Sequence, residues 1–423
     1  MRADGYLAPD RGSDGPVPTG PHLLDVSMFW GPTGGVRRVL TTKQMLFKRQ
    51  GWRHTVMAPG VTGRDRIDCG GVTIPASGGY RAVMRRDHAA ALIERAQPDI
   101  VEAADPYTLA WSVLDASRRL GVPAVAFCHS NLPALAARWA GGVDAMKTRR
   151  GRWAWLRARQ YLVKLYSRFD CVLAPSRGLA QLLHGWGVPR VAHQPLGVDS
   201  AVFTPAAADP TWRWGLEQKL ELAPGTKLLV YSGRFAAEKN LQVLADALAL
   251  LGPGHVLLAI GSGPTPPRGT HVRVLPPESD SRRLARLLAS CDAYLHAGDQ
   301  ETFGLGVLEA MACGAPVVVS AAAGLGELAE GAGRLVHGLR AADWAEAIEA
   351  SLAEGITATA GAAVRRAREH DWRHIVQQLS QRYVGLMCGH ALTTTQARQV
   401  LQGAEPHALP TSVGPLAELT QPL

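Results

Sequence analysis

Two successive series of short apolar runs, each run followed by a longer helix-like segment, constrain the fold of this chain more than any other feature. The first series lies between residues 22 and 129, and the second lies between residues 226 and 320. Short apolar runs that alternate with helical patterns are typical of parallel strands joined by crossover helices. The sequence therefore predicts an α/β protein with two doubly wound, Rossmann-like sheets.

The length of the chain also favours two domains. Its 423 residues exceed the size at which a single hydrophobic core usually stops growing. We expect an N-terminal domain over residues 21–200 and a C-terminal domain over 201–387, connected through the Pro-rich segment 195–218, which is predicted to be an irregular linker. A final helix near 371–387 is predicted to cross back to the N-terminal domain, and the two domains are predicted to face each other across a cleft.

Both ends of the chain are predicted to be loosely ordered. Residues 1–20 are rich in Gly, Pro and Asp, which predicts a disordered lead-in, and residues 388–423 show little hydrophobic periodicity. No charged and then apolar leader opens the chain, and the longest apolar run, 310–326, is interrupted by glycine and proline, so no membrane span is expected. The six cysteines form no CxxC pair, which favours reduced thiols and a cytoplasmic location.

The net charge of +9 indicates an anionic partner: a phosphorylated substrate, an anionic lipid surface or a nucleic acid. Segment 145–169 holds eight Lys and Arg, four Trp and Tyr, and no acid. Such a helix could make peripheral contact with the inner face of the cell membrane, or bind a phosphorylated lipid. The alternative is an ordinary amphipathic helix in which Trp153, Leu156 and Val163 pack inward. No nucleic-acid-binding motif accompanies the basic run, so nucleic acid is not expected as a partner.

Candidate site residues are expected at the ends of the predicted strands, because open α/β sheets bind ligands at the carboxyl ends of their strands. Gly34 and Gly35 follow the first strand, where they would let backbone N–H groups approach an anion; the alternative is a tight turn. Gly233 and Gly261 follow two strands of the second series, in the segments YSGRF and AIGSGP. The latter segment does not match the dinucleotide fingerprint, which argues against a dehydrogenase.

Two cations, Arg234 and Lys239, follow the first strand of the second series. An arginine can hold a phosphate through two parallel hydrogen bonds, and a lysine adds a mobile point charge. We therefore expect these side chains to bind an anionic group. The alternative is a solvated turn in which Lys239 pairs with Glu238.

Two acids eight residues apart, Glu301 and Glu309, lie around the start of a predicted helix that ends at Gly314. Helical spacing would separate them by about 12 Å along the axis, which is too far for two carboxylates to share a proton. We therefore expect them to bind two different ligand groups. The alternative makes Glu301 a helix cap and turns Glu309 to solvent, although the neighbours of Glu309 are nearly all apolar.

These motifs together resemble those of the retaining glycosyltransferases of family 4, which have the GT-B fold. The early glycine pair, the GR…EKN segment, the GSGP loop and the E-x7-E pair occur in the family's order over about residues 22–385. The resemblance implies that Glu301 contacts hydroxyl groups of the donor sugar and that Glu309 binds the donor ribose. It also implies that Arg234 and Lys239 hold the diphosphate. By the same resemblance, the domain over 21–200 would bind the acceptor and the domain over 201–387 would bind the nucleotide sugar.

The resemblance assigns further residues. His129, which follows a strand of the first series, would lie beside the reacting sugar carbon and join Glu301 as a catalytic residue; the alternative is a structural histidine. Backbone amides at the start of the helix that carries Glu309 would face the leaving phosphates. The remaining implied donor-binding residues are Gly34, Gly35, Gly233, Gly261, Phe303, Gly304, Leu305 and Gly306.

The implied activity is retaining transfer of a hexose, such as mannose or glucose, from a GDP- or UDP-linked donor to a glycan or lipid-linked acceptor in cell-envelope or exopolysaccharide synthesis. Fixed cations and amide dipoles would stabilise the charge on the departing diphosphate. No cofactor is expected, and because the sequence contains no D-x-D triplet we predict a metal-independent reaction. Two alternatives stay open: a nucleotide-sugar epimerase of the same fold, and a non-catalytic homologue that binds a nucleotide sugar.

Overall fold

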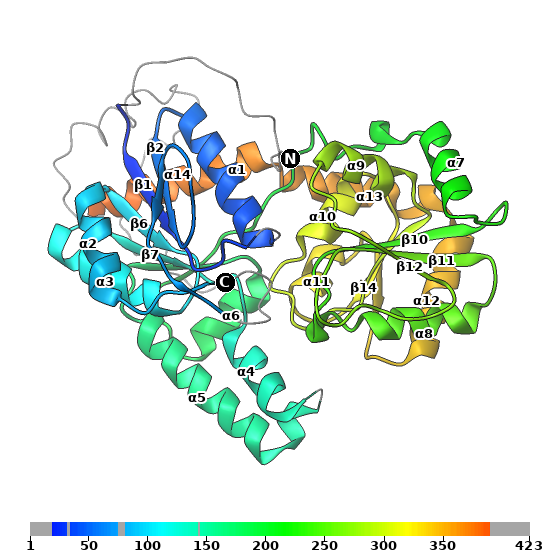
Figure 1. Cartoon of the computed structure of the whole chain (residues 1–423), viewed down its shortest axis with the longest axis horizontal. Helices are drawn as coiled ribbons and strands as arrows, with labels where there is room; N and C mark the ends of the chain where they lie inside the picture. Colours follow the sequence, from blue (N-terminus) through cyan, green and yellow to red (C-terminus); the bar gives the residue numbers. More distant parts are fainter. Residues whose placement is uncertain (1–18, 32–33, 75–80, 143, 390–423) are drawn as a thin grey trace. The chain divides into compact units, whose positions relative to one another are not determined.

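A computed structural model describes residues 19–31, 34–74, 81–142 and 144–389 of the chain (Figure 1). The predicted lead-in and tail therefore lie almost entirely outside the described residues. Two compact units account for the described chain. The C-terminal unit contains residues 195–375, and the N-terminal unit contains the described residues before 195 together with residues 376–389.

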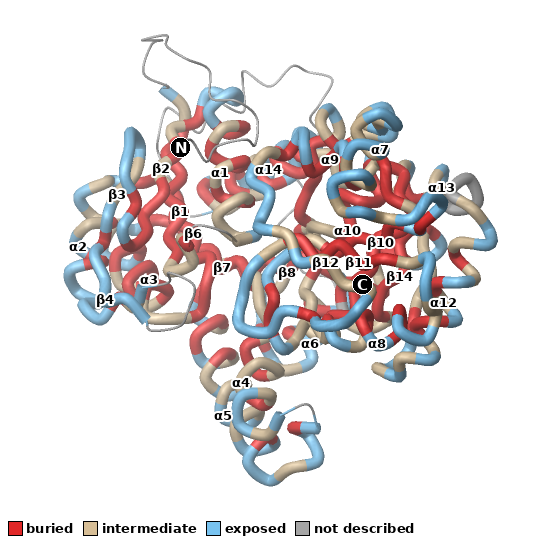
Figure 2. Tube along the Cα trace, turned by 45° about the vertical axis from the view of Figure 1, so that its right-hand side comes forward, coloured by how far each residue is buried: buried red, intermediate tan, exposed pale blue. Residues whose placement is uncertain are grey.

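The N-terminal unit is built on a seven-stranded parallel sheet with the order β3-β2-β1-β6-β7-β8-β9. Strands β6, β7 and β8 are buried at every position, as expected for central strands of a parallel sheet that helices cover on both faces (Figure 2). A short antiparallel pair, β4 with β5, is separate from this sheet. The strands are β1 (His22–Val26), β2 (Arg53–Ala58), β3 (Arg66–Asp68), β4 (Val72–Thr73), β5 (Arg81–Ala82), β6 (Ile100–Ala103), β7 (Ala124–Phe127), β8 (Cys171–Ala174) and β9 (Val191–His193). The helices are α1 (Gly35–Arg49), α2 (Arg86–Ala96), α3 (Thr108–Leu120), α4 (Leu132–Gly141), η1 (Ala145–Lys147), α5 (Arg149–Tyr166) and α6 (Arg177–Gly185).

The C-terminal unit is built on a six-stranded parallel sheet with the order β12-β11-β10-β13-β14-β15. Its apolar runs form the strands that their composition predicts, and each strand leads into a helix or a loop at its carboxyl end. The strands are β10 (Lys227–Ser232), β11 (His255–Ile260), β12 (Val272–Leu275), β13 (Ala293–His296), β14 (Val317–Ser320) and β15 (Arg334–Val336). The helices are η2 (Pro205–Ala207), α7 (Pro210–Lys219), η3 (Ala237–Lys239), α8 (Leu241–Leu251), α9 (Ser281–Ser290), α10 (Leu305–Ala312), α11 (Ala323–Ala329), α12 (Ala341–Glu354) and α13 (Ile356–Glu369).

Each sheet has one point at which the strand order reverses. This switch point lies between β1 and β6 in the N-terminal sheet and between β10 and β13 in the C-terminal sheet. The loops that leave the two strands at a switch point run in opposite directions, which opens a crevice at the carboxyl edge of the sheet. The two parallel sheets with crossover helices confirm the predicted α/β fold class.

Two parts of the chain differ from the prediction of two domains joined by a linker. These are the segment between the two series of strands and the last helix. Residues 195–218, predicted to be an irregular linker, contain most of helix α7, so the prediction of irregular structure is wrong there. Asp209 begins this helix, because its side chain accepts a hydrogen bond from the N–H of Trp212 at 2.9 Å. Helix α14 (Trp372–Gly389) starts in the C-terminal unit and belongs to the N-terminal unit from Val376 onwards.

A group of five polar side chains lies fully buried in the N-terminal unit, at its switch point. Lys43 of α1 donates hydrogen bonds to Asp25 of β1 at 3.0 Å and to Glu102 of β6 at 2.6 Å. Tyr383 of α14 bonds to Glu102 and accepts from Lys43 at 3.2 Å, and His54 of β2 bonds to Asp25 at 2.8 Å. We call these five residues the buried cluster. It connects three strands and two helices, one of which lies 340 residues from Lys43.

Candidate functional site

Three loops at the carboxyl edge of the C-terminal sheet are connected by hydrogen bonds to backbone carbonyl groups. The N–H of Gly233 donates to the carbonyl of Ile260 at 2.9 Å, and the N–H of Phe235 donates to Ser262 at 2.8 Å. Asn240 reaches the third loop, where its side-chain amide donates to the carbonyl of Ala297 at 3.0 Å. The loops that follow β10, β11 and β13 are therefore held in one place, at the switch point.

Glycine is required where these loops approach closely. A Cβ atom at Gly261 would overlap the carbonyl oxygen of Gly233, and the φ angle of Gly261, +155°, is one that residues with side chains rarely adopt. A Cβ atom at Gly306 would overlap the hydroxyl of Tyr294, which itself donates to the carbonyl of Ser232 at 3.0 Å. The structure thus brings Gly233, Gly261 and Gly306, which the sequence predicted, into the same small region.

The central feature of this region is an ion pair between Lys239 and Glu301. Lys239 ends η3 and Glu301 follows β13, and the two side chains keep 17% and 18% of their surface exposed. The predicted alternative, a pair between Lys239 and Glu238, is wrong. Glu238 instead pairs with Arg234 at 2.5 Å, and this arginine is more than half exposed. Both predicted phosphate-binding cations are therefore present at the switch point and partly open to solvent.

His296, the last residue of β13, is a further member of the site that the sequence did not indicate. Its Nε2 lies 3.2 Å from Oε1 of Glu301, and its Nδ1 accepts the N–H of Gly298 at 3.1 Å. Because Nδ1 accepts a hydrogen bond, the neutral ring carries its proton on Nε2 and donates it to Glu301. The sequence did hold one signal for His296: it is a polar residue at the carboxyl end of a predicted strand, five positions before Glu301.

The environment of Glu301 keeps this carboxylate ionised. Burial by itself would raise its pKa, but the Lys239 ammonium and the His296 hydrogen bond outweigh burial, so the pKa of Glu301 lies well below its usual value. We call Lys239, His296 and Glu301 the site cluster. It contains one carboxylate and two donor side chains. The ion pair between Lys239 and Glu301 therefore leaves hydrogen-bonding groups that can still contact a ligand.

Helix α10 presents an uncapped N-terminus to this region. Its N-cap residue is Gly304, at φ +106°, and no side chain caps the helix. The alternative interpretation of Glu301 as a helix cap is therefore wrong. The N–H of Leu308 bonds to Gly304, whereas the first N–H groups of a helix, here from Leu305 onwards, have no acceptor within the helix. Phe303 is buried just before this turn, with its ring 5.7 Å from that of His370.

Glu309 lies in the second turn of α10 and is almost completely buried, which excludes the alternative that it faces solvent. Its helical neighbours Val307, Leu308, Ala310 and Met311 are buried as well. A carboxylate in such surroundings needs hydrogen-bonding partners. Its assignment to the donor ribose stays a prediction.

The remaining predicted site residues belong to the N-terminal unit. Gly34 is the N-cap residue of α1, Gly35 is its first residue, and His129 follows β7. The imidazole of His129 stacks on Phe127, with 4.3 Å between ring centroids and 6° between planes. Burial, reinforced by the charge of Lys43, lowers the pKa of His129 to about 3, so its ring is neutral near pH 7.

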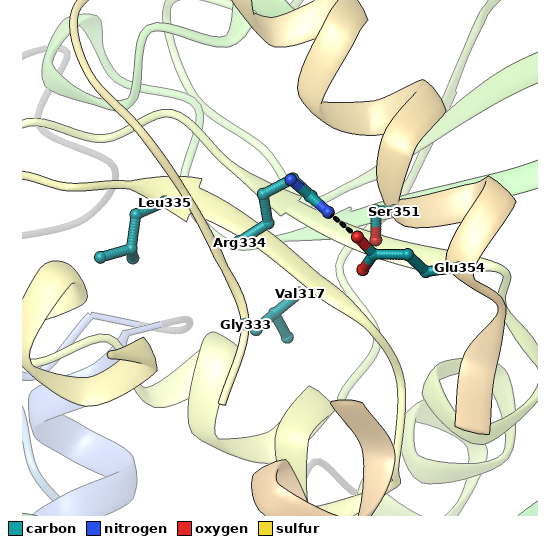
Figure 3. Close-up of a pocket in the computed structure, with 6 residues that line it drawn as sticks. All are labelled: Val317, Gly333, Arg334, Leu335, Ser351 and Glu354. Carbon is teal, nitrogen blue, oxygen red and sulfur yellow. Dashed lines mark hydrogen bonds and ion pairs between the residues drawn. The ribbon is translucent and has the colours of Figure 1, made fainter. Parts of the chain in front are cut away.

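A cavity of about 300 Å³ lies at the opposite edge of the C-terminal sheet (Figure 3). It is lined by the first residues of β14 and β15, Val317 and Arg334, and by the end of α12, where Glu354 pairs with Arg334. Ligands of parallel sheets bind at the carboxyl edge instead. This cavity is therefore not part of the candidate site, and its ion pair offers a useful control.

The described residues offer neither a metal site nor a membrane span. Within the described ranges, no group of three or more His, Cys, Asp or Glu is arranged to hold a metal ion. No helix in the part of the chain that the structure describes combines the length and apolarity needed to cross a bilayer. The cysteines are free thiols, all of them buried except Cys388.

Cations and an uncapped helix N-terminus at the switch point of a parallel sheet define a class of α/β proteins that bind anionic ligands. Similarity to known proteins identifies the family within this class. The family model described as Glycosyltransferase Family 4 matches residues 33–202, and the model described as Glycosyl transferases group 1 matches residues 226–354.

Similar proteins support the same assignment. A GDP-mannose-dependent alpha-mannosyltransferase of Mycolicibacterium smegmatis is 35% identical over 54% of this chain and 57% of its own length, so the chain spans little more than half of that relative. A GDP-mannose-dependent alpha-(1-6)-phosphatidylinositol dimannoside mannosyltransferase of Mycobacterium tuberculosis is 31% identical over 72% of this chain and 81% of its own length. The chain belongs to the family 4 glycosyltransferases, as its motifs predicted.

A solved structure supports the fold. Sucrose-phosphate synthase of Thermosynechococcus elongatus resembles this chain with a TM-score of 0.71 and 20% identity, over 87% of this chain and all of that one. At this identity the likeness shows the fold alone. It confirms two Rossmann-like domains of the GT-B type.

Proposed function

We propose that this protein transfers a mannosyl residue from GDP-mannose to a lipid-linked mannoside in the synthesis of a cell-envelope glycan. The observation that carries this proposal is the site cluster beside the uncapped N-terminus of α10. Membership of family 4 supports sugar transfer, and the names of the two mycobacterial relatives support GDP-mannose as the donor. UDP-linked hexoses are the second class of donor to be tested.

The donor would be held by its charged and polar groups. Arg234, Lys239 and the first N–H groups of α10 are the proposed ligands of the diphosphate, on which negative charge develops as it departs. Glu301 is the proposed acceptor of hydrogen bonds from the sugar hydroxyls, because its carboxylate is ionised and already oriented by His296. Glu309 is the proposed ligand of the ribose.

We propose that the reaction retains the configuration of the anomeric carbon and needs no metal ion. The site cluster holds one carboxylate, whereas double displacement requires two at about 5 Å from each other across the sugar. A departing phosphate oxygen that accepts the proton of the incoming hydroxyl would account for transfer on the same face of the sugar. Cations of the protein then take the part that a metal ion plays in other enzymes.

The N-terminal unit contributes the remaining proposed roles. A neutral His129 can act as a hydrogen-bond donor or acceptor to a sugar hydroxyl, and Gly34 and Gly35 leave the backbone at the start of α1 open to a ligand. For the acceptor, the name of the Mycobacterium tuberculosis relative points to a phosphatidylinositol mannoside. We propose an acceptor of that chemical class.

The test measures release of nucleoside diphosphate from a panel of GDP- and UDP-linked sugars, with and without phosphatidylinositol dimannoside, in the presence and absence of EDTA. Acceptor-dependent release of GDP that resists EDTA is the expected result, with an α-linked product by nuclear magnetic resonance. An inverted product or loss of activity in EDTA would overturn the mechanism. Conversion of the donor to another sugar nucleotide without an acceptor would support an epimerase instead.

Two substitutions test the site. Lys239→Ala and Glu301→Ala should each lower turnover about 100-fold or more, because each removes a group that acts on developing charge or on the sugar. Lys227→Ala and Glu354→Ala are matched controls at the amino edge of the same sheet, and both should keep wild-type turnover. Measurable binding of every donor without any turnover would favour a non-catalytic binding protein.

A further inference from the structure

The helical hairpin formed by α4, η1 and α5 has a preformed tip. The two helices cross so closely that a Cβ atom on Gly141 would lie 3.2 Å from the Cα of Gly151. Thr148 fixes the turn between them: its hydroxyl donates to the carbonyl of Ala145 at 2.9 Å and accepts the N–H of Gly151 at 2.9 Å. Figure 1 shows the hairpin projecting from the sheet of the N-terminal unit, so its tip is held in place by its own contacts.

Large apolar side chains are exposed around this tip. Trp139 of α4 is 79% exposed and Trp153 of α5 is 66% exposed, and each lies two residues from the glycine contact between the helices. Met146 of η1 and Leu156 of α5 are about half exposed. The alternative in which Trp153 and Leu156 pack inward is therefore wrong, and only Val163 of that set is partly buried. A cluster of exposed apolar residues of this size marks a contact surface.

The same surface is strongly basic. Residues 132–169 contain nine Lys and Arg and a single acid, Asp144, which pairs with Lys147. For the arginines of the first turns of α5, no carboxylate of the described residues lies within ion-pairing distance. These arginines are Arg149, Arg150 and Arg152. Their charge is therefore available to an anionic partner.

Tryptophan and arginine side chains exposed around the tip of one hairpin suit the interface of an anionic bilayer. The indole ring fits the boundary between head groups and acyl chains, and the guanidinium groups reach the phosphates of the lipids. The guanidinium of Arg157 already lies 6.0 Å from the ring centroid of Trp153, which keeps charge and ring together at one depth. A protein partner would need neither this excess of charge nor its interleaving with tryptophan.

We propose that the tip of the α4–α5 hairpin docks on an anionic lipid bilayer, inserting Trp139, Met146 and Trp153 among the head groups while the arginines of α5 bind lipid phosphates. The docking surface consists of Trp139, Met146, Arg149, Arg150, Arg152 and Trp153. The inference extends the proposed function, since a lipid-linked acceptor lies in such a bilayer. It does not depend on the chemistry at the site cluster, because its test measures binding alone.

The test is cosedimentation of the full-length protein with phosphatidylcholine vesicles that contain or lack phosphatidylglycerol. Binding should be at least about 10-fold tighter to the anionic vesicles and should weaken as salt is raised. The triple variant Arg149→Gln, Arg150→Gln, Arg152→Gln should lose most of this preference. The double variant Trp139→Ala, Trp153→Ala should weaken binding about 10-fold while keeping the dependence on charge.

Matched controls use exposed residues of the C-terminal unit. Trp214→Ala on α7 removes an exposed tryptophan, and Arg282→Gln with Arg283→Gln on α9 removes two exposed arginines. Neither should change vesicle binding. Because all substituted side chains are exposed, the variants should keep the thermal midpoint of the wild type, and the single variant Arg150→Glu serves as a milder second test.

Three outcomes would overturn the proposal. These are equal binding to both kinds of vesicle, wild-type binding by the triple arginine variant, and binding of a duplex oligonucleotide in the absence of vesicle binding. The last outcome would make the surface a nucleic-acid surface. Turnover on a water-soluble mannoside acceptor, measured with the same variants, separates this proposal from the proposed function. Variants that lose vesicle binding but keep that turnover leave the enzyme assignment standing.

Discussion

Both units place a lysine against carboxylates at the switch point of a parallel sheet, but one of these clusters is closed to solvent and the other is not. In the buried cluster of the N-terminal unit, Lys43 and its two acids have essentially no exposed surface. In the site cluster of the C-terminal unit, Lys239 and Glu301 each keep about a sixth of their surface exposed. The same chemical pair therefore serves a structural role in one unit and is accessible to a ligand in the other.

The two clusters also differ in their balance of acidic and basic side chains. The buried cluster contains two acids for one lysine, and Asp25 faces Glu102 directly across the β1–β6 ladder. By the same count the site cluster has one acid for one lysine. Excess acid in a closed site favours a retained proton, whereas a balanced and accessible pair leaves its lysine able to contact an anionic ligand. The difference shows how a shared architecture supports two uses of charge.

The largest predicted effect comes from a lysine substitution in the buried cluster. Lys43→Met should lower the stability of the N-terminal unit by about 3–5 kcal/mol, because it leaves Asp25 and Glu102 buried without their cation. Urea unfolding and hydrogen exchange of β1 and β6 peptides would measure this loss. Adding Glu102→Gln should restore part of it. Wild-type stability in Lys43→Met would show that the cluster does not hold the unit together.

The matched substitution in the site cluster should act on activity instead. Lys239→Met should lower turnover about 100- to 1,000-fold and change the stability of the C-terminal unit by less than about 1 kcal/mol, because Glu301 keeps its bond to His296 and its access to water. Turnover and hydrogen exchange on the same preparation would test both parts. A large loss of stability with normal turnover would reverse the roles assigned to the two clusters.

The pH dependence of stability offers a third test. Burial, together with the charge of Asp25 and against that of Lys43, raises the pKa of Glu102 to about 7 from an ordinary value near 4.5. The folded protein then binds this proton more tightly than the unfolded chain, so the contribution to stability is fully present below about pH 4.5 and is lost as the pH rises through about 7. The expected slope is at most about 1.4 kcal/mol per pH unit.

Unfolding between about pH 5 and pH 8, compared in the wild type and in Glu102→Gln, would isolate this slope, because an amide mimics the protonated acid while other buried groups such as Asp105 act alike in both proteins. Glu301 should contribute no slope there, since its pKa is lowered and its carboxylate is ionised throughout. Equal slopes in the wild type and in Glu102→Gln would contradict the assignment of the proton to Glu102.

The smallest predicted effect concerns the last helix. Tyr383→Phe should lower stability by about 1 kcal/mol, because it removes one hydroxyl from a network whose other members stay paired. The ring would still stack on Phe47, at 5.8 Å between centroids. Faster hydrogen exchange confined to the end of α14 and to β6 is the expected pattern, and a loss as large as that of Lys43→Met would mean that the hydroxyl dominates the cluster.

Local patterns in the sequence predicted much of this molecule. The alternation of apolar runs and helical segments predicted most strands and helices within residues 22–129 and 226–320, because period and turn residues are local properties of the chain. Strands β8, β9 and β15 lie outside these two series and were not predicted. The motifs predicted the family for the same reason: Glu301 and Glu309 flank the start of one helix, and their spacing is visible in sequence. Glycines such as Gly261 were also readable, since a close turn needs them.

Pairing between distant residues was decided by the tertiary structure alone. Lys239 pairs with Glu301 across 62 positions rather than with its neighbour Glu238, because β10 and β13 are adjacent at the switch point. Strand order likewise joins Asp25 to Glu102, and α14 brings Tyr383 to them. Trp153 is exposed although α5 packs on α4 and η1 near the tip. Sequence specifies which groups the chain carries, and the order of the strands decides which of them meet.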